Sequence, residues 1–146
     1  MKSFVIDNSV VMAWYFEDEA TPYTQAVLES LNKYECTVPS IWTLEVANAL
    51  IVSERRGRST EARVARFITL LGSLPIHIDT NTSRYALSET LQIAREYKLS
   101  SYDAAYLELS MREGVPISTQ DKALRQAASE CGVKIFKGSR GELKGG

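Results

Sequence analysis

Histidine and cysteine are scarce in this sequence, which limits the kinds of site that it can build. The 146 residues include one histidine, His77, and two cysteines, Cys36 and Cys131, far apart along the chain. A Cys/His zinc site and a disulfide framework are therefore not expected. Catalysis of the triad type needs an imidazole base, but His77 lies in the short apolar run 75–78, which is typical of a strand. We expect His77 to be a strand residue without a catalytic role.

Glycine-rich loops are also missing. No glycine-rich turn follows a predicted strand, and four of the eight glycines occupy positions 138, 141, 145 and 146. A Rossmann or P-loop nucleotide site is therefore disfavoured. The segment 138–146 lacks the apolar content that packing requires. We expect one domain over residues 1–137, followed by a flexible tail over 138–146.

The sequence has no excess of charge and no long apolar run. Lysine and arginine number 17 against 18 acids, so the net charge is -1 and no basic surface is available to hold nucleic acid by charge alone. A phosphate-bearing partner must then be bound locally or through a cation. No apolar stretch reaches the roughly 18 residues of a membrane span, and residues 1–7 lead directly into a strand pattern. We expect a cytoplasmic protein that does not bind a membrane.

Short β-rich runs alternate with amphipathic segments along the chain, which predicts an α/β fold with a parallel sheet covered on both faces. The predicted strands are 4–7, 36–38, 76–78, 117–119 and 133–136. The predicted helices are 9–16, 22–33, 40–56, 60–71, 82–97, 101–113 and 121–131.

Acidic residues follow predicted strands or begin predicted helices. Asp7 ends the first strand, with Ser9 two residues later, and Asp121 follows the fourth strand after Thr119. Asp103 lies in the first turn of a helix. Each of these acids also suits a purely structural role, because carboxylates cap helices and interact favourably with the helix dipole.

Glu45 differs from the other acids because residues 41–52 of its predicted helix, 40–56, are almost entirely apolar around it. A buried carboxylate costs several kcal/mol unless it is paired or coordinates a cation. Asn48 lies one turn further along the same face and can brace Glu45 or contact a ligand. The alternative is a buried polar pair that fixes the packing of the helix.

Together the four acids predict a cation site. Ligands of an open parallel sheet bind beyond the carboxyl ends of the strands, where Asp7, Glu45, Asp103 and Asp121 can converge. Four carboxylates cannot share a cleft unless they are protonated or neutralised. Hard oxygen ligands select Mg²⁺ or Mn²⁺.

The residues that carry these acids resemble the PIN-domain nucleases, in particular the small VapC-like toxins of toxin-antitoxin pairs. The resemblance extends to about Phe136 and rests on four segments in order, which are Asp7-Asn8-Ser9, Glu45-Val46-Ala47-Asn48-Ala49-Leu50, Ser101-Tyr102-Asp103-Ala104-Ala105-Tyr106-Leu107 and Thr119-Gln120-Asp121-Lys122-Ala123-Leu124. It implies a three-layer α/β/α sandwich with a five-stranded parallel sheet. It also implies an endoribonuclease that depends on Mg²⁺ or Mn²⁺ and leaves 5′-phosphate and 3′-hydroxyl ends.

Residue roles follow from the same resemblance. The catalytic and metal-binding acids are Asp7, Glu45, Asp103 and Asp121, supported by Ser9, Asn48 and Thr119. Some relatives carry a further acid two residues after the fourth, where this chain has Ala123, so a second metal position lacks a ligand. Without a histidine base, Asp103 or Asp121 must orient or deprotonate the attacking water, and both alternatives stay open.

Three partners are expected: RNA as substrate, a cognate antitoxin protein, and a second copy of the chain in a homodimer. The densest basic segment contains Arg55, Arg56 and Arg58, which can contact RNA phosphates or simply end a solvated helix. The aromatic segment 14–16 with Tyr23 is expected to be mostly core, with a residual apolar groove for the antitoxin.

Three other functions stay open from the sequence. A PIN-domain nuclease of RNA processing or decay would carry the same acids outside a toxin-antitoxin pair. A phospho-aspartate phosphoryl-transfer protein would also place Asp7 at a strand end, although phosphatases of that kind have an acid where this chain has Ser9. A non-catalytic PIN-like binding module would not need all four acids.

Overall fold

The computed structural model describes residues 2–138. Met1 and residues 139–146 lie outside the described part, so the prediction of a flexible tail is not tested beyond Gly138. Gly138 itself is buried, and a side chain there would meet the backbone of Ala26. Within residues 2–138, no helix is both long and apolar enough to cross a bilayer.

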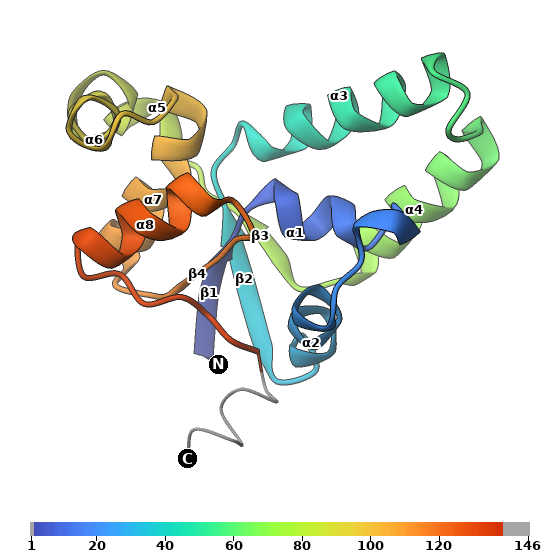
Figure 1. The fold of residues 1–146 in the computed structure, drawn as a ribbon, viewed down its shortest axis with the longest axis horizontal. Helices are drawn as coiled ribbons and strands as arrows, with labels where there is room; N and C mark the ends of the chain where they lie inside the picture. Colours follow the sequence, from blue (N-terminus) through green and yellow to red (C-terminus); the bar gives the residue numbers. More distant parts are fainter. Residues whose placement is uncertain (1, 139–146) are drawn as a thin grey trace.

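Four parallel strands form the sheet, which confirms the predicted α/β fold with a parallel sheet (Figure 1). The strands are β1 (Lys2–Ile6), β2 (Tyr34–Val38), β3 (Ile76–Ile78) and β4 (Ile117–Ser118), in the order β3-β2-β1-β4. The register pairs Phe4 with Cys36, and Cys36 with Ile76. Central β1 is fully buried from Phe4 to Ile6, as expected for a parallel strand with apolar contacts on both faces.

The prediction of five strands is wrong. The segment predicted as the fifth strand makes only one bridge, between Ile135 and Ile117. Immediately afterwards Phe136 stacks on Phe4 with ring centroids 3.8 Å apart, and its carbonyl accepts a hydrogen bond from the Tyr23 hydroxyl at 2.6 Å. At Phe136, aromatic packing and this hydrogen bond therefore take the place of further pairing with β4.

The helices occupy most of the predicted positions. They are α1 (Asn8–Ala13), α2 (Pro22–Ser30), α3 (Trp42–Arg55), α4 (Glu61–Ser73), α5 (Thr82–Tyr85), α6 (Leu91–Tyr97), α7 (Ser101–Glu113) and α8 (Lys122–Glu130), with the 3₁₀ turn η1 (Glu17–Glu19). The predicted continuous helix over 82–97 is interrupted by a π-helical segment, η2 (Ala86–Thr90). Such π segments are rare and are frequent at functional sites.

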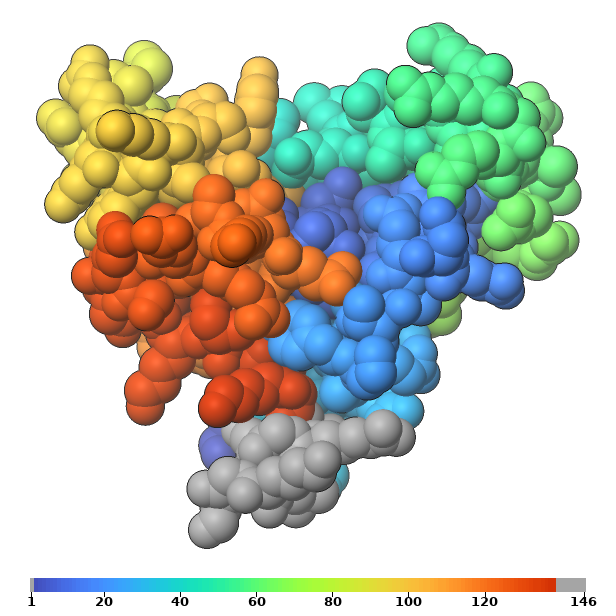
Figure 2. Space-filling model, viewed as in Figure 1, coloured from blue at the N-terminus to red at the C-terminus, as the bar shows by residue number. Residues whose placement is uncertain are grey.

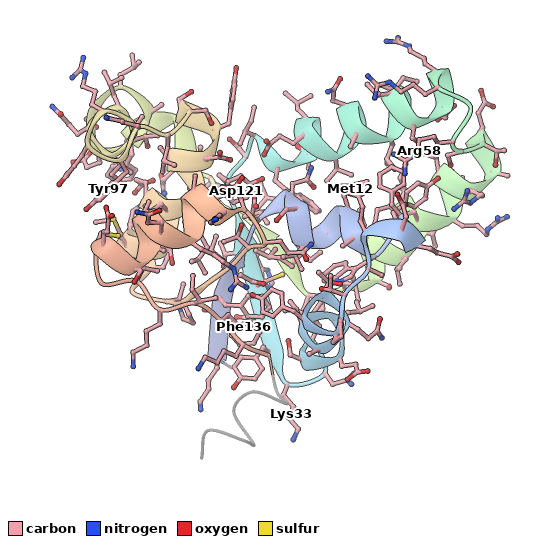
Figure 3. All side chains as sticks on the ribbon, in the orientation of Figure 1. Met12, Lys33, Arg58, Tyr97, Asp121 and Phe136 are labelled. Carbon is pink, nitrogen blue, oxygen red and sulfur yellow. The ribbon has the colours of Figure 1, made fainter. Side chains whose placement is uncertain are left out.

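Helices lie to either side of the strands in Figure 1, with α7 and α8 on one side and α2 on the other. Helices α3 and α4 extend away from the sheet, and the space-filling view is hollowed between α3 and the yellow region around α5 and α6 (Figure 2). Asp121, which Figure 3 labels, lies at the start of α8 on the side of the strands that faces this hollow.

Candidate active site

The carboxyl ends of β1 and β4 meet at the centre of the site. Ile6 pairs with Ser118 in the parallel ladder, and the Asp7 N–H donates to the Ser118 carbonyl at 2.9 Å. The residues directly after the two strands therefore lie side by side. This register brings Asp7 next to Thr119, which is 112 positions away in sequence.

Hydrogen bonds hold the Asp7 carboxylate in one orientation. Its Oδ1 accepts the Asn8 N–H at 2.8 Å, and its Oδ2 accepts the hydroxyls of Ser9 and Thr119, each at 2.8 Å. Asp7 is 5% exposed. Burial raises the pKa of the Asp7 carboxyl although these hydrogen bonds favour the ionised form. Asp7 also caps α1, so both roles predicted for it use the same side chain.

Ser9 and Thr119 extend this network to α8. The Thr119 hydroxyl oxygen accepts the Asp121 N–H at 3.0 Å, and the Ser9 hydroxyl oxygen accepts the Gln120 N–H at 3.0 Å. Asp121 caps α8, because its Oδ1 accepts the Leu124 N–H at 2.8 Å. Its other carboxylate oxygen makes no hydrogen bond within residues 2–138. The capping role therefore leaves this oxygen available to a ligand.

Glu45 reaches the same edge from α3. Its Oε1 accepts a hydrogen bond from the fully buried Tyr106 hydroxyl at 2.5 Å. Burial raises the pKa of the Glu45 carboxyl, the Tyr106 hydrogen bond opposes this shift, and the charges of Asp7 and Asp103 add to it. Tyr106, which follows Asp103 by three positions on α7, thus orients the Glu45 carboxylate.

Asp103 completes the group of four acids, which we call the acid cluster (Asp7, Glu45, Asp103 and Asp121). The Ser100 hydroxyl oxygen accepts the Asp103 N–H at 3.1 Å and caps α7. Burial raises the pKa of Asp103, and the charges of Asp7 and Asp121 raise it further. Electrostatic repulsion therefore links all four acids, although they come from four different elements.

The expectation that α3 is a buried helix is wrong. Its buried positions, Trp42, Val46, Leu50 and Ser53, form one stripe, whereas Leu44 is 68% exposed. Glu45 is half-buried at the margin of this stripe, and Asn48 is exposed. Tyr106, rather than Asn48, is the hydrogen-bond partner of Glu45. Asn48 instead lines a hollow of about 360 Å³ together with Asn8 and Ser9.

Comparison with known proteins identifies this arrangement. The sequence model described as the PIN domain matches residues 4–130. The chain belongs to the PIN domain family. Proteins of this family are generally nucleases.

A solved structure supports the fold of this PIN domain. The crystal structure of PAE2754 from Pyrobaculum aerophilum superposes with a TM-score of 0.64 at 24% identity, covering 86% of each chain. At this identity the likeness concerns the fold alone. No curated protein matches the chain.

PIN domains typically bind divalent metals, and the acid cluster has the right chemistry for one. All its ligand atoms are hard carboxylate oxygens, which suit Mg²⁺ or Mn²⁺. Burial raises the pKa values of Glu45 and Asp103, and the charges of the neighbouring acids raise them further, as expected for carboxylates without a neutralising cation. Within residues 2–138 no three acidic, histidine or cysteine side chains lie close enough together, as they stand, to hold a metal ion. An ion would therefore have to draw the side chains together.

The three arginines predicted to contact RNA in this PIN domain fall into two groups. Arg58 donates from one guanidinium nitrogen to both Asp18 oxygens, at 3.1 and 3.2 Å, and lies 4.5 Å over the Phe16 ring. Arg55 and Arg56, at the end of α3, make no ion pair within the described chain. Arg56 lines the hollow that contains Asn8 and Asn48. Of these three arginines, Arg55 and Arg56 therefore have charges that no acid within residues 2–138 neutralises.

The aromatic residues near α1 are occupied within the fold. The Trp14 indole donates to the Thr24 carbonyl at 2.9 Å, and Tyr15 is buried. The hollow beside α1 includes the apolar side chains of Met12 and Phe16, so the groove predicted there stays a prediction. A further apolar groove lies between α3, α4 and β3, with a volume of about 390 Å³. Exposed Ile68 and Ile78 line this second groove.

Sequence reasoning missed Tyr106 as part of the site. Tyr106 follows Asp103 by three positions, so both side chains lie on one face of α7. This spacing is the sequence signal that could have placed the Tyr106 hydroxyl beside the acids. His77, by contrast, lies in β3 as predicted and contacts Glu35 at 3.0 Å, remote from the acid cluster.

Proposed function

We propose that this protein is an endoribonuclease that depends on Mg²⁺ or Mn²⁺, and that it is the toxin of a VapBC-like toxin-antitoxin pair. The observation that carries the nuclease proposal is the acid cluster. Its four carboxylates lie at one sheet edge of a PIN domain, where burial raises the pKa of Glu45 and Asp103 and repulsion between the acids raises it further. Such a cluster is electrostatically costly unless a cation neutralises it.

The residues that would hold the metal are Asp7, Glu45, Asp103 and Asp121. When bound, Mg²⁺ or Mn²⁺ would offset the negative charge of the scissile phosphate and favour ionisation of a nucleophilic water. The sequence supplies no acid at Ala123 that would hold a second ion. The chain thus provides four acidic ligands and supporting hydroxyls for one such centre.

The protein side chains have separable roles in this mechanism. Ser9 and Thr119 fix the Asp7 carboxylate, and Tyr106 fixes Glu45, so the negative charge is preorganised. Asp103 or Asp121 would accept the proton of the attacking water, because both are acidic groups of the cluster and no histidine lies nearby. In-line attack would break the P–O3′ bond and leave 5′-phosphate and 3′-hydroxyl ends.

RNA would approach the acid cluster along the hollow beside α1 and α3. Asn8 and Ser9 adjoin Asp7, Asn48 lies one turn after Glu45, and Arg56 lies at the far end of the hollow. Arg55 and Arg56 would contact phosphates, whereas Arg58 is neutralised by Asp18. With a net charge of -1, the chain would have weak general affinity for RNA, which favours selective cleavage over uniform degradation.

The proposal includes two protein partners, a cognate antitoxin and a second copy of the chain. The apolar groove between α3, α4 and β3 supports a docked amphipathic segment, since Ile68 is 55% and Ile78 47% exposed. We also propose that the helices on either side of the strands in Figure 1 make the three-layer α/β/α sandwich implied by the resemblance. Sedimentation velocity of the isolated chain measures whether it forms a dimer.

Mapping of new 5′-phosphate ends in total cellular RNA tests the nuclease proposal. A few discrete cuts with Mg²⁺ or Mn²⁺, absent in Glu45→Gln, are expected. Uniform degradation would indicate a scavenging nuclease, and cuts confined to precursor RNA would indicate processing. The absence of cuts together with labelling by acetyl phosphate would replace the proposal with a phospho-aspartate enzyme.

Growth after induction tests the toxin role separately. Expression of the parent chain should arrest growth, and expression of Asp7→Asn should not. An active ribonuclease that leaves growth unchanged would favour a function in RNA processing or decay.

A further inference from the structure

A second cavity lies on the other side of the acid cluster from the arginines. It has a volume of about 290 Å³ and lies between the start of α3, the α5–η2 segment and the start of α7. The residues that line it are mainly hydroxyl-bearing or apolar, and they are Ser40, Ile41, Leu44, Thr82, Ser83, Ala86, Thr90, Ser101, Tyr102 and Ala105. We call this the side cavity.

The side cavity adjoins the acid cluster through two of its walls. Leu44 immediately precedes Glu45 on α3, and Tyr102 immediately precedes Asp103 on α7. A polymer bound across the acids would therefore place its neighbouring unit at the mouth of this cavity. In Figure 2 the surface is hollowed between α3 and the α5–α6 region, which is where these walls meet.

Thr90 is an unexplained polar group in the side cavity. It is 3% exposed, and its hydroxyl has no hydrogen-bond partner within the described residues. A threonine in a regular helix can donate to the carbonyl one turn earlier, but Thr90 ends the π-helical segment η2. Rotation about χ1 moves the hydroxyl between staggered positions, and Thr90 is one of the residues that line the cavity. A buried hydroxyl without a partner is costly, and a ligand would satisfy it.

Tyr102 supplies an aromatic surface at the same cavity. Its side chain is 58% exposed although it lies directly beside the acids. RNA-binding proteins read unpaired bases by stacking them on exposed aromatic rings and bonding their edges to polar side chains. Tyr102 offers the aromatic ring for stacking, and Thr90 offers the polar group for the edge of the base.

We propose that the side cavity binds an unpaired nucleobase of the RNA, next to the scissile phosphate, and so determines where the strand is cut. The proposal rests on the ribonuclease function above and adds the specificity-determining residues Tyr102 and Thr90. Tyr102 stacks on the base, and the Thr90 hydroxyl bonds its edge. The hydroxyls of Ser83 and Ser101, which also line the cavity, provide further polar contacts.

A second copy of the chain is the competing occupant, because Leu44 and Tyr102 are exposed and partly apolar. The lining favours the base. Hydroxyl groups contribute five of the ten lining residues besides the tyrosine phenol, whereas the core of a homodimer interface is more apolar than average surface. The volume of about 290 Å³ lies at the lower end of small-molecule sites, which suits one flat ring better than a helix.

Titration of the ¹⁵N-labelled full chain with each nucleoside 5′-monophosphate tests the side cavity without requiring cleavage. At least one nucleotide should shift the amide signals of Thr90, Tyr102 and Ala105. Tyr102→Ala should weaken its binding about 5- to 100-fold, because stacking is lost, while Tyr102→Phe keeps the ring and the affinity. Thr90→Val should weaken it about 2- to 10-fold, and the matched control Thr69→Val on α4 should not.

Several outcomes would overturn the proposal. Shifts that are absent, or that persist unchanged in Tyr102→Ala, would show that no base binds there. A dimer that dissociates in Tyr102→Ala, measured by sedimentation velocity, would assign the surface to a second copy.

RNA cleavage by the same variants separates this proposal from the ribonuclease function. The parent should show a base preference at one position beside the cut, and Tyr102→Ala should lose that preference while Thr69→Val retains it. Nucleotide binding without any RNA cleavage would refute the ribonuclease and leave the cavity assignment standing. RNA cleavage without nucleotide binding would support the ribonuclease and refute the cavity assignment.

Discussion

The two ends of helix α7 hold acids in opposite electrostatic settings. At its start, Asp103 belongs to the acid cluster, where burial and neighbouring charges raise its pKa. At its end, Arg112 donates to both Asp79 oxygens, at 3.0 and 2.8 Å, and to both Glu108 oxygens, at 2.8 and 3.0 Å. Hydrogen bonds from Arg112 lower the pKa of Asp79.

This contrast separates a structural ion network from a functional one. Asp79 and Glu108 are buried with an internal cation, so their charge is neutralised as the chain folds. The acid cluster has hydroxyl and backbone donors, and no arginine or lysine of residues 2–138 is bonded to it. At the start of α7 no side chain of residues 2–138 plays the part of Arg112. We propose that a divalent cation from solution neutralises the acids there.

The largest expected effect is on cleavage by Asp7→Asn. Loss of this carboxylate should lower the cleavage rate about a thousandfold, comparable to removing a preorganised electrostatic group. Asparagine caps helices as well as aspartate does, and the substitution relieves repulsion, so the melting temperature in EDTA should be equal or higher. Melting and single-turnover cleavage measured on one preparation check this. A variant that unfolds would show instead that the fold needs the Asp7 carboxylate, which accepts the Ser9 and Thr119 hydroxyls, for its stability.

Arg112→Ala should have the opposite outcome. Removing the cation leaves the buried carboxylates of Asp79 and Glu108 uncompensated, which costs about 3 kcal/mol of unfolding free energy. Urea denaturation measures the loss. Arg58→Ala is the matched control, because its exposed pair with Asp18 contributes at most about 1 kcal/mol. Equal losses in the two variants would remove the distinction between the networks.

Tyr106→Phe should have a smaller effect on cleavage. It removes the donor that orients Glu45 and keeps the buried ring, so cleavage should fall about tenfold, as for other groups that orient metal ligands. The affinity for Mn²⁺ should fall with it, which a purely structural role would not cause. Unchanged affinity and rate would show that Glu45 does not need this hydrogen bond.

The pH dependence of stability should differ in sign between the two networks. Raised pKa values of Asp7, Glu45 and Asp103 mean that the folded chain binds more protons than the unfolded chain between the ordinary and raised values. Their unfavourable contribution therefore fades as pH falls through the raised pKa values. The stabilising contribution of Asp79 is present above its ordinary pKa and is lost as pH falls through its lowered pKa.

Melting curves of the parent and Asp7→Asn in EDTA, from about pH 7.5 to about pH 5, isolate the contribution of the acid cluster. The advantage of the variant should shrink by a few degrees as pH falls. An advantage that grows toward low pH would contradict the raised pKa of Asp7.

Sequence patterns predicted the helices, the parallel strands and the four acids that the fold brings to one edge. The alternation of β-rich and amphipathic segments predicts a parallel sheet with helices between its strands. Parallel strands have their carboxyl ends on the same side of the sheet, where the acids that follow them gather. The burial of α3 was misjudged because its apolar residues also cover the exposed side, where Leu44 lies. The buried residues of α3 recur every three or four positions. Because the residues between them are also mostly apolar, the sequence alone does not show which side of the helix is buried.

Long-range partners were beyond the reach of sequence reasoning. The pairing of Arg112 with Asp79 joins α7 to the segment after β3 across 33 positions. The hydrogen bond from Tyr106 to Glu45 spans 61 positions. Neither spacing is a local pattern, because both depend on how the helices pack. The short contact of Ile135 with β4 likewise depends on the packing of Phe136.

Calorimetric titration with Mn²⁺ tests the central claim, that the acid cluster holds a divalent cation, most directly. The parent should bind the ion at a site that Asp7→Asn and Asp103→Asn lose, while the control Asp18→Asn, which removes an exposed carboxylate, retains it. Binding of equal affinity in the parent and in both cluster variants would contradict the account, because the acids would then hold no metal.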